Sequence, residues 1–188
     1  EGALYSPIVM ILRGPEHEGY PWLESPFWID VISCAAVKHP ILSQSPTGEL
    51  RLSTQDAEWL RQKIRCILTI AEANGAQVVV LTAIGCGAYR HPPSQVTKIM
   101  RDELDNFHYQ PGQYKRAIIA ILDDHNTRGA TNREGNVDPF DRVFSPEGAD
   151  LMQHLADSRS HMPEGSPNGT THQHADQVPD HSNPQDNT

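Results

Sequence analysis

The residues best suited to bind a ligand form a short glycine-rich turn, Gly85-Cys86-Gly87. The turn follows an apolar run at residues 76–83 and precedes Pro92-Pro93-Ser94, which is typical of the first turn of a helix. Glycines on both sides of Cys86 let the backbone turn sharply and approach a ligand without a Cβ in the way. The N–H groups at the start of the following helix favour an anion such as a diphosphate. A plain strand-to-helix turn explains the spacing equally well, so this pattern leaves both interpretations open.

Cys86 could itself be a nucleophile, because the start of a helix lowers the pKa of a thiol. His91 and His125 are conceivable bases for it, although the sequence places neither beside the sulfur. A small, buried spacer between two glycines is the interpretation that the sequence favours.

Polar residues also follow two other apolar runs. Asp123-Asp124-His125-Asn126 comes after residues 116–122, and Lys38-His39-Pro40 comes after residues 28–37. The first group could supply metal ligands or acid–base catalysts, or it could simply end a strand with a turn. Residues 132–140 are polar, and we expect a loop there that folds over the edge of a site. Ligands of open parallel sheets bind beyond the carboxyl ends of the strands, which is where these groups fall.

The elements that position these residues alternate between strand and helix. Apolar runs predict strands at residues 4–12, 28–37, 76–83 and 116–122, the third of them covered on both faces. A helix is predicted to begin after Ser53, with Asp56 three residues later, and to end near Gly75. A second helix is predicted from Pro92-Pro93 to about Leu104. This order predicts an α/β domain with a mostly parallel sheet.

Composition narrows the partners and the cellular compartment that we expect for the chain. The 188 residues carry a net charge of −9, which argues against nucleic acid as a direct partner, and no apolar run is long enough to span a membrane. Three widely spaced cysteines fit a reducing compartment, so the cytoplasm or the nucleus is expected. Residues 1–156 are predicted to form the domain, and residues 157–188 a disordered polar tail. The tail histidines could bind a metal, but a solvated tail is favoured: His161, His172, His174 and His181.

Several segments together resemble one known family. The strings LYSPIVMILRG, DVISCAAV, VVVLTAIGCGAYRHPP and AIIAILDDHNTRGATNREGNVDPFDRVF are similar to the later part of microbial-type poly(ADP-ribose) glycohydrolases, a branch of the macrodomain fold. The resemblance covers residues 4–144 and implies a three-layer α/β/α domain that binds ADP-ribose. It also implies poly(ADP-ribose) and ADP-ribosylated proteins as partners, and hydrolysis of the ribose–ribose bond in the complete family.

The resemblance assigns roles to individual residues. Gly85, Cys86, Gly87 and Ala88 match the loop that wraps the diphosphate through its backbone N–H groups, and Tyr89 matches an aromatic residue beside the distal ribose. The possible edge of this site comprises Ile84, Asp124, His125 and Asn126. No metal or cofactor is implied.

The sequence departs from the family at its catalytic signature. The family has a Gly-Gly-Gly stretch followed by Gln-Glu-Glu, located before the counterpart of Leu4, and neither triplet occurs in these residues. We therefore expect an N-terminally truncated macrodomain, assign no catalytic residue, and expect the chain alone to be inactive. A non-catalytic ADP-ribose reader or a degenerate macrodomain remains the alternative. Another α/β nucleotide-binding protein is a third possibility, although a P-loop is absent from the sequence.

Overall fold

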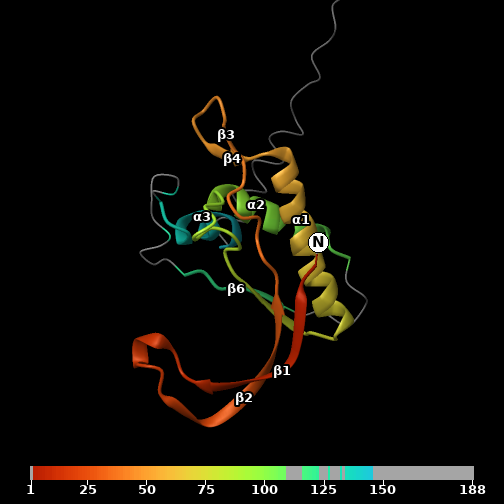
Figure 1. The fold of residues 1–188 in the computed structure, drawn as a ribbon, viewed down its shortest axis with the longest axis vertical. Helices are drawn as coiled ribbons and strands as arrows, with labels where there is room; N and C mark the ends of the chain where they lie inside the picture. Colours follow the sequence, from red (N-terminus) through yellow and green to blue (C-terminus); the bar gives the residue numbers. More distant parts are fainter. Residues whose placement is uncertain (1, 109–115, 123–126, 128–131, 133, 146–188) are drawn as a thin grey trace, which may run out of the picture.

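The structure is a computed structural model that describes residues 2–108, 116–122, 127, 132 and 134–145 (Figure 1). Its helices and strands follow one another in this order: β1 (Leu4–Arg13), a short 3₁₀ helix (Glu16–Glu18), β2 (Trp22–Ser33), β3 (Leu42–Gln44), β4 (Leu50–Leu52), α1 (Thr54–Ala73), β5 (Val78–Leu81), α2 (Pro93–Asn106), β6 (Arg116–Ile119) and α3 (Val137–Phe144). The predicted α/β class is confirmed. The predicted tail at 157–188 lies outside the described residues, so the proposed domain boundary stays a prediction.

Helix α1 begins and ends where the sequence predicted. The Ser53 hydroxyl accepts a hydrogen bond from the Asp56 N–H at 3.1 Å and donates one to the Asp56 carboxylate at 2.7 Å. The buried Asp56 carboxylate also accepts the Ile41 N–H at 2.9 Å, which fixes the chain segment that precedes the helix. Gly75 follows the last turn with a φ of 72°, a left-handed conformation that glycine adopts without a Cβ clash.

The hydrophobic core lies between α1, α2 and β5. Leu60, Ile64 and Leu68 recur on one face of α1 at helical spacing and are at most 1% exposed. They share one cluster of buried side chains with residues of the other two elements: Val79, Leu81, Val96, Ile99 and Met100. This packing fixes the start of α2 relative to the end of β5, which are the two ends of the glycine-rich turn.

A buried carboxylate ties α1 to α2 at the edge of this core. Glu103 is 4% exposed and accepts hydrogen bonds from Arg61 at 3.1 Å and from Arg65 at 3.0 Å. The two guanidinium groups reach solvent while the carboxylate does not, so the pairing offsets the cost of burying its charge.

Strands β5 and β6 pair in parallel, as predicted, with Val78 opposite Arg116 and Leu81 opposite Ile119. Their carboxyl ends therefore lie at one edge of the sheet. The prediction that β5 is covered on both faces does not hold within the described residues. Val79 and Leu81 are buried against the helices, but Val78 and Val80 are 49% and 57% exposed on the other face.

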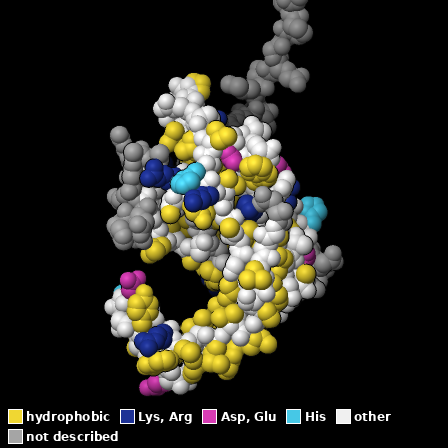
Figure 2. Space-filling view, viewed as in Figure 1, with side chains coloured by type: hydrophobic (Ala, Val, Ile, Leu, Met, Phe, Trp, Pro, Cys, Tyr) yellow, Lys and Arg dark blue, Asp and Glu magenta, His cyan; other side chains and the backbone are white. Residues whose placement is uncertain are grey.

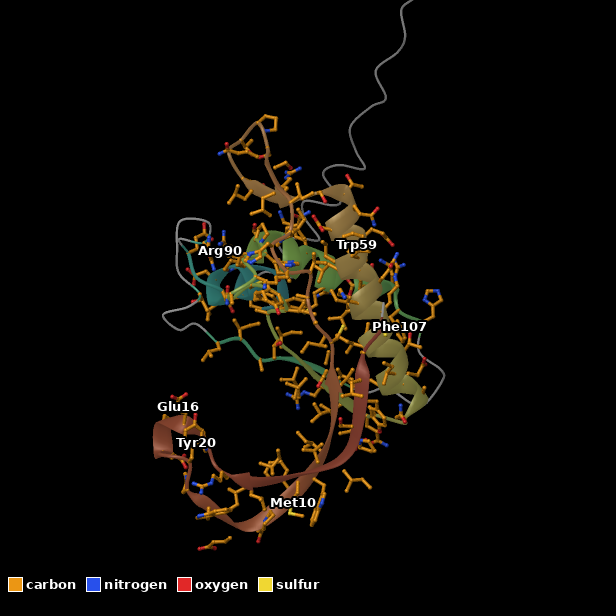
Figure 3. The ribbon with its side chains drawn as sticks, in the orientation of Figure 1. Met10, Glu16, Tyr20, Trp59, Arg90 and Phe107 are labelled. Atoms are coloured by element: carbon orange, nitrogen blue, oxygen red, sulfur yellow. The ribbon has the colours of Figure 1, made fainter. Side chains whose placement is uncertain are left out.

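Strands β1 and β2 form an antiparallel arm that extends from the body of the molecule, a pairing that the sequence did not predict (Figure 1). The strand predicted at 28–37 begins earlier, at Trp22, and ends at Ser33. Apolar side chains cover the arm, and a hollow separates its tip from the body (Figure 2). Met10, Glu16 and Tyr20 mark its course away from the helices (Figure 3).

The arm contains a bulge at Pro7-Ile8, where the register shifts between Ser6 and Val9. Ile8 has a φ of 56°, and its N–H donates to the Asp30 carboxylate at 2.9 Å. The Tyr5 hydroxyl donates to the same carboxylate at 2.7 Å. Both hydrogen bonds favour the charged form, so they hold the pKa of Asp30 below its usual value, the Ile8 N–H contributing most.

Two further elements were not predicted. β3 and β4 form a short antiparallel hairpin. α3 begins at Val137 and so overlaps the end of residues 132–140, where a loop was predicted. Asn136 precedes α3 and Pro139 lies in its first turn, so these residues begin a helix rather than prevent one. No helix among the described residues is both long and apolar enough to cross a membrane.

Candidate functional site

The glycine-rich loop runs from Ile84 to His91 and joins β5 to α2, as predicted. Two successive turns shape it. The Cys86 N–H donates to the Ala83 carbonyl at 3.1 Å, and the Arg90 N–H donates to the Gly87 carbonyl at 2.9 Å. A third bond, from the His91 N–H to the Gly85 carbonyl at 3.0 Å, closes the loop at its base.

Gly85 is required by both its backbone and its neighbours. Its φ is 80°, and a Cβ at this position would lie 2.7 Å from the His91 ring and 3.0 Å from the Ala36 Cβ. Gly87 differs, because its φ is ordinary and a Cβ there would meet nothing within 4 Å among the described residues. The first glycine therefore serves the fold, whereas the second faces open space.

His91 links the loop to the segment after β2. The side chain is 1% exposed, and its Nε2 donates to the Val37 carbonyl at 2.8 Å. Its Nδ1 is buried without a hydrogen-bond partner in the described part of the chain. Burial lowers the pKa of His91, while the Val37 carbonyl and the Asp56 carboxylate act in the opposite direction. The ring is therefore a neutral hydrogen-bond donor. The sequence analysis had named His91 only as a conceivable base for Cys86.

Cys86 is buried, and its environment does not suit a catalytic nucleophile. Its side chain is 2% exposed, and its Sγ donates weakly to the Ile84 carbonyl at 3.8 Å. Burial raises the pKa of the thiol to about 12, so almost none of it is thiolate at neutral pH. The structure thus favours the buried spacer over the nucleophile.

The loop presents backbone donors that no other described residue binds. Among the hydrogen bonds of the described residues, none involves the N–H of Gly85, Gly87, Ala88 or Tyr89. Successive free N–H groups in a turn suit an anion. The start of α2 offers fewer free N–H groups for an anion than the sequence suggested. Pro92 and Pro93 have no N–H, and the N–H groups of Gln95 and Val96 already donate to the Pro92 carbonyl.

The other predicted site residues divide into two groups. Ala88 is exposed, and Tyr89 and Ile84 are half-buried. Arg90, which was not predicted as a site residue, extends from the same loop at the surface (Figure 3). Asp124, His125 and Asn126 lie outside the described residues, so their place at the site edge stays a prediction.

Two asparagines that sequence reasoning missed, Asn132 and Asn136, form side-chain hydrogen bonds among the described residues that follow β6. The Asn132 side chain donates to the Thr127 carbonyl at 2.8 Å and to the Asn136 Oδ1 at 3.0 Å. Asn136 is 4% exposed and donates to the Leu122 carbonyl at 3.4 Å. The signal for its position was present in the sequence, as an asparagine directly before Val137-Asp138-Pro139.

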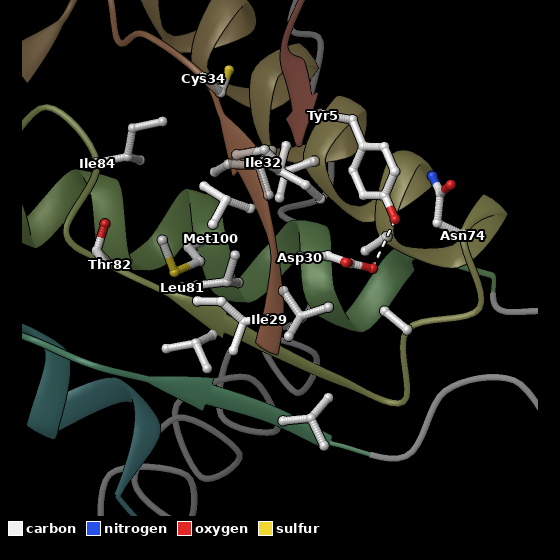
Figure 4. A pocket seen from close by; sticks show the side chains of 18 residues that line it. Tyr5, Ile29, Asp30, Ile32, Cys34, Asn74, Leu81, Thr82, Ile84 and Met100 are labelled. Atoms are coloured by element: carbon white, nitrogen blue, oxygen red, sulfur yellow. Dashed lines mark hydrogen bonds between the residues drawn. The ribbon is translucent and has the colours of Figure 1, made fainter. Parts of the chain in front are cut away.

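A cavity of about 660 Å³ lies beside the loop, between β2 and β5 (Figure 4). Its lining is mostly apolar, with a polar end formed by Tyr5, Asp30 and Asn74. Thr82 and Ile84 border it where β5 passes into the loop. The described residues contain no group of three or more histidine, cysteine or acidic side chains that could hold a metal ion.

Residues 34–100, which include α1 and the glycine-rich loop, match the Macro domain family. The chain has a macrodomain fold. The poly(ADP-ribose) glycohydrolase of Deinococcus radiodurans in complex with ADP-ribose is 26% identical, with a TM-score of 0.59 over 77% of this chain and 52% of that chain. The apo form of the same enzyme is also 26% identical, with a TM-score of 0.56 over 74% of this chain and 52% of that chain.

The glycohydrolase of Thermomonospora curvata is 23% identical, with a TM-score of 0.54 over 76% of this chain and 47% of that chain, and supports the fold alone. This macrodomain thus spans about half the length of the solved structures it matches. The resemblance to microbial-type glycohydrolases is confirmed. A search of curated proteins finds no match.

The two glycines should respond differently to the same substitution. Gly85→Ala forces a Cβ against His91 and Ala36 at a positive φ, and should lower the free energy of unfolding by at least about 2 kcal/mol. Gly87→Ala should change it by less than about 0.5 kcal/mol. Urea unfolding of both variants measures the difference, and equal losses would contradict this description of the loop.

His91 should make the stability of the macrodomain fall in acid. Its native pKa is lowered, so the neutral ring stabilises the fold fully above the unfolded pKa of about 6.5, and this contribution is lost as the pH falls below that value. His91→Gln keeps a donor for the Val37 carbonyl but cannot titrate. Urea unfolding at pH 5 to 8 should therefore show a smaller acid loss in the variant than in the parent, whereas parallel curves would remove His91 as the cause.

Proposed function

We propose that this macrodomain binds ADP-ribose and that the loop from Gly85 to Tyr89 holds the diphosphate. The observation that carries the proposal is the set of N–H groups on Gly85, Gly87, Ala88 and Tyr89, which form no hydrogen bond in the described part of the chain. They lie in a loop whose shape is fixed by Gly85 and His91, with open space at Gly87. A preformed array of donors binds an anion without a further ordering cost.

The rest of the ligand has candidate neighbours in the same loop. Tyr89 would pack beside the distal ribose. The family usually has a phenylalanine at this position, and the hydroxyl of Tyr89 could form a hydrogen bond that a phenylalanine cannot. Ile84, Asp124, His125 and Asn126 are proposed for the edge of the site. Support for this ligand comes from the Deinococcus enzyme, which is 26% identical and was solved in complex with ADP-ribose.

We place the domain in a microbial-type poly(ADP-ribose) glycohydrolase-like protein, in the cytoplasm or the nucleus. Hydrolysis would need a general acid to protonate the leaving ribose oxygen, and the family's Gln-Glu-Glu stretch does not occur in these 188 residues. The chain would then supply the part of the site that holds the ligand. The alternative is a non-catalytic reader of ADP-ribose, or a degenerate macrodomain, that binds without hydrolysis.

ADP-ribose should stabilise the purified macrodomain. At a ligand concentration about 100 times Kd, binding to the native state contributes about 2.7 kcal/mol, which should raise Tm by roughly 5–10 °C. Gly87→Val should abolish most of this rise, because its Cβ enters open space in the loop and its branched side chain should then obstruct the free N–H groups. Differential scanning fluorimetry and isothermal titration calorimetry measure both effects.

Ala73→Val is the matched control, since Ala73 is exposed in the last turn of α1, near the start of β5 rather than its carboxyl end. This variant should keep the full ADP-ribose shift. If Gly87→Val keeps its native Tm and the full shift as well, the loop does not bind the diphosphate.

The chain alone should not hydrolyse poly(ADP-ribose). Without a positioned general acid, release of ADP-ribose should fall below detection, a loss of at least about 10²-fold relative to an enzyme that carries one. Chromatography of the products after incubation with the polymer tests this, with the Deinococcus enzyme as the positive control. Measurable release by the chain would show that another residue supplies the proton.

A further inference from the structure

Three exposed basic side chains lie beside the glycine-rich loop. Arg90 belongs to the loop itself, and Lys38 and His39 directly follow Val37, whose carbonyl binds the His91 ring. Since Arg90 and Lys38 each adjoin one partner of this 2.8 Å hydrogen bond, they belong to two segments that meet. Figure 2 shows a histidine among lysine or arginine side chains on the face where Figure 3 labels Arg90. We call Lys38, His39 and Arg90 the basic rim.

The basic rim has no acidic partner of its own. Among the described residues, no hydrogen bond or ion pair involves the side chain of Lys38, His39 or Arg90. All other described arginines except Arg116 contact a carboxylate or an aromatic ring: Arg13, Arg51, Arg61, Arg65, Arg101 and Arg142. In a chain with a net charge of −9, unpaired basic side chains beside a candidate anion site indicate a further negative group on the ligand.

The backbone at Arg90 is unusual for an arginine. Its φ is 60°, in the left-handed region that glycine adopts most readily. Holding an arginine there costs stability, and its guanidinium makes no contact with a described residue that would offset this cost. Strained conformations of this kind concentrate at ligand sites. The side chain of Arg90 therefore serves something other than the stability of the fold.

The basic rim adjoins the donors proposed for the diphosphate without being one of them. The Arg90 N–H donates to the Gly87 carbonyl at 2.9 Å, so this turn holds the Cα atoms of the two residues within about 7 Å. Arg90 is exposed, whereas the next residue, His91, is 1% exposed and bonds inward. A polyanion that starts on the free N–H groups of Ala88 and Tyr89 therefore meets the guanidinium of Arg90 next.

We propose that the basic rim is a second phosphate subsite, which binds the diphosphate of the ADP-ribose unit next to the one in the glycine-rich loop. This inference rests on the proposed function, because the first unit is taken to lie in that loop. Each further unit of a poly(ADP-ribose) chain carries another diphosphate, and the guanidinium of Arg90 can donate two parallel hydrogen bonds to a phosphate. Lys38 and His39 supply further donors. A single ADP-ribose has no phosphate left for the rim once its own diphosphate lies on the loop.

Isothermal titration calorimetry with ADP-ribose and with a dimer of ADP-ribose units tests the subsite. The dimer should bind at least about tenfold more tightly, because charge-assisted hydrogen bonds are among the stronger polar contacts. Its affinity should also fall more steeply with salt. In single-stranded nucleic acids, each phosphate contact changes the slope of log K against log salt by about −0.7, and a similar change is expected here. Equal affinities and equal slopes for the two ligands would overturn the inference.

Arg90→Gly separates the subsite from the fold. Glycine adopts the φ of 60° without strain, so Tm should stay within about 2 °C of the parent or rise. The Kd of the dimer should nevertheless rise at least about tenfold, and that of ADP-ribose much less. A side chain that only supported the loop would lower Tm when removed, and that result together with equal losses for both ligands would contradict the subsite.

A pair of charge reversals provides the matched control. Lys38→Glu should weaken binding of the dimer more than that of ADP-ribose. Arg116→Glu should leave the dimer's advantage intact. Arg116 is also exposed and forms no side-chain contact with a described residue, but it lies opposite Val78, at the amino end of the β5–β6 pair. If the two reversals weaken the dimer equally, net charge is the cause and the inference fails.

Two further outcomes would assign the basic rim differently. If a single-stranded oligonucleotide with as many phosphates as the dimer binds equally well, and Arg90→Gly weakens it equally, the rim is a general polyanion surface. If Arg90→Gly weakens ADP-ribose as much as the dimer, Arg90 belongs to the diphosphate of the first unit. Either result overturns the inference. Failure of the parent to bind ADP-ribose at all would overturn the proposed function, whereas an affinity for the dimer that depends on Arg90 would then still support the rim.

Discussion

The hydrogen bond between His91 Nε2 and the Val37 carbonyl is the contact on which the site depends. β2 and β5 do not pair in the described chain, so their carboxyl ends need another link. His91 supplies it at 2.8 Å, and the absence of a Cβ at Gly85 allows its ring to sit directly against the loop. The ring must remain neutral in this buried position, because a charged imidazole there would be poorly solvated. The shape of the glycine-rich loop therefore depends on the protonation of one side chain.

Local signals explain which parts of this fold could be predicted from sequence. Helix α1 has a serine cap, a helical apolar pattern and a terminal glycine, and the structure reproduces all three. The loop between β5 and α2 was also predicted, because glycines and prolines constrain the backbone within a few residues. The role of His91 was not, since its partner, Val37, lies far away in sequence.

Long-range pairing explains most of what could not be predicted. An apolar run does not show whether a strand pairs in parallel, so the antiparallel arm of β1 and β2 was missed. The strand predicted to reach Val37 ends at Ser33, and the residues after it pass over Gly85 and His91 instead. α3 has only eight residues and was taken for a loop, but the burial of Phe140 and Val143 stabilises it. The same limit applies to β5, whose valine-rich sequence predicted two covered faces although the described residues cover one.

The bulge in β1 has a consequence for how the chain meets other chains in solution. Exposed strand edges are templates on which identical proteins polymerise. In β1 the template is interrupted, because Pro7 has no N–H and Ile8 turns its own toward Asp30. Growth of the sheet from the outer edge of β1 is thereby discouraged, because two consecutive residues offer no N–H to an incoming strand. The arm can thus expose apolar side chains such as Ile8 and Met10 while its outer edge is interrupted against growth into a fibre.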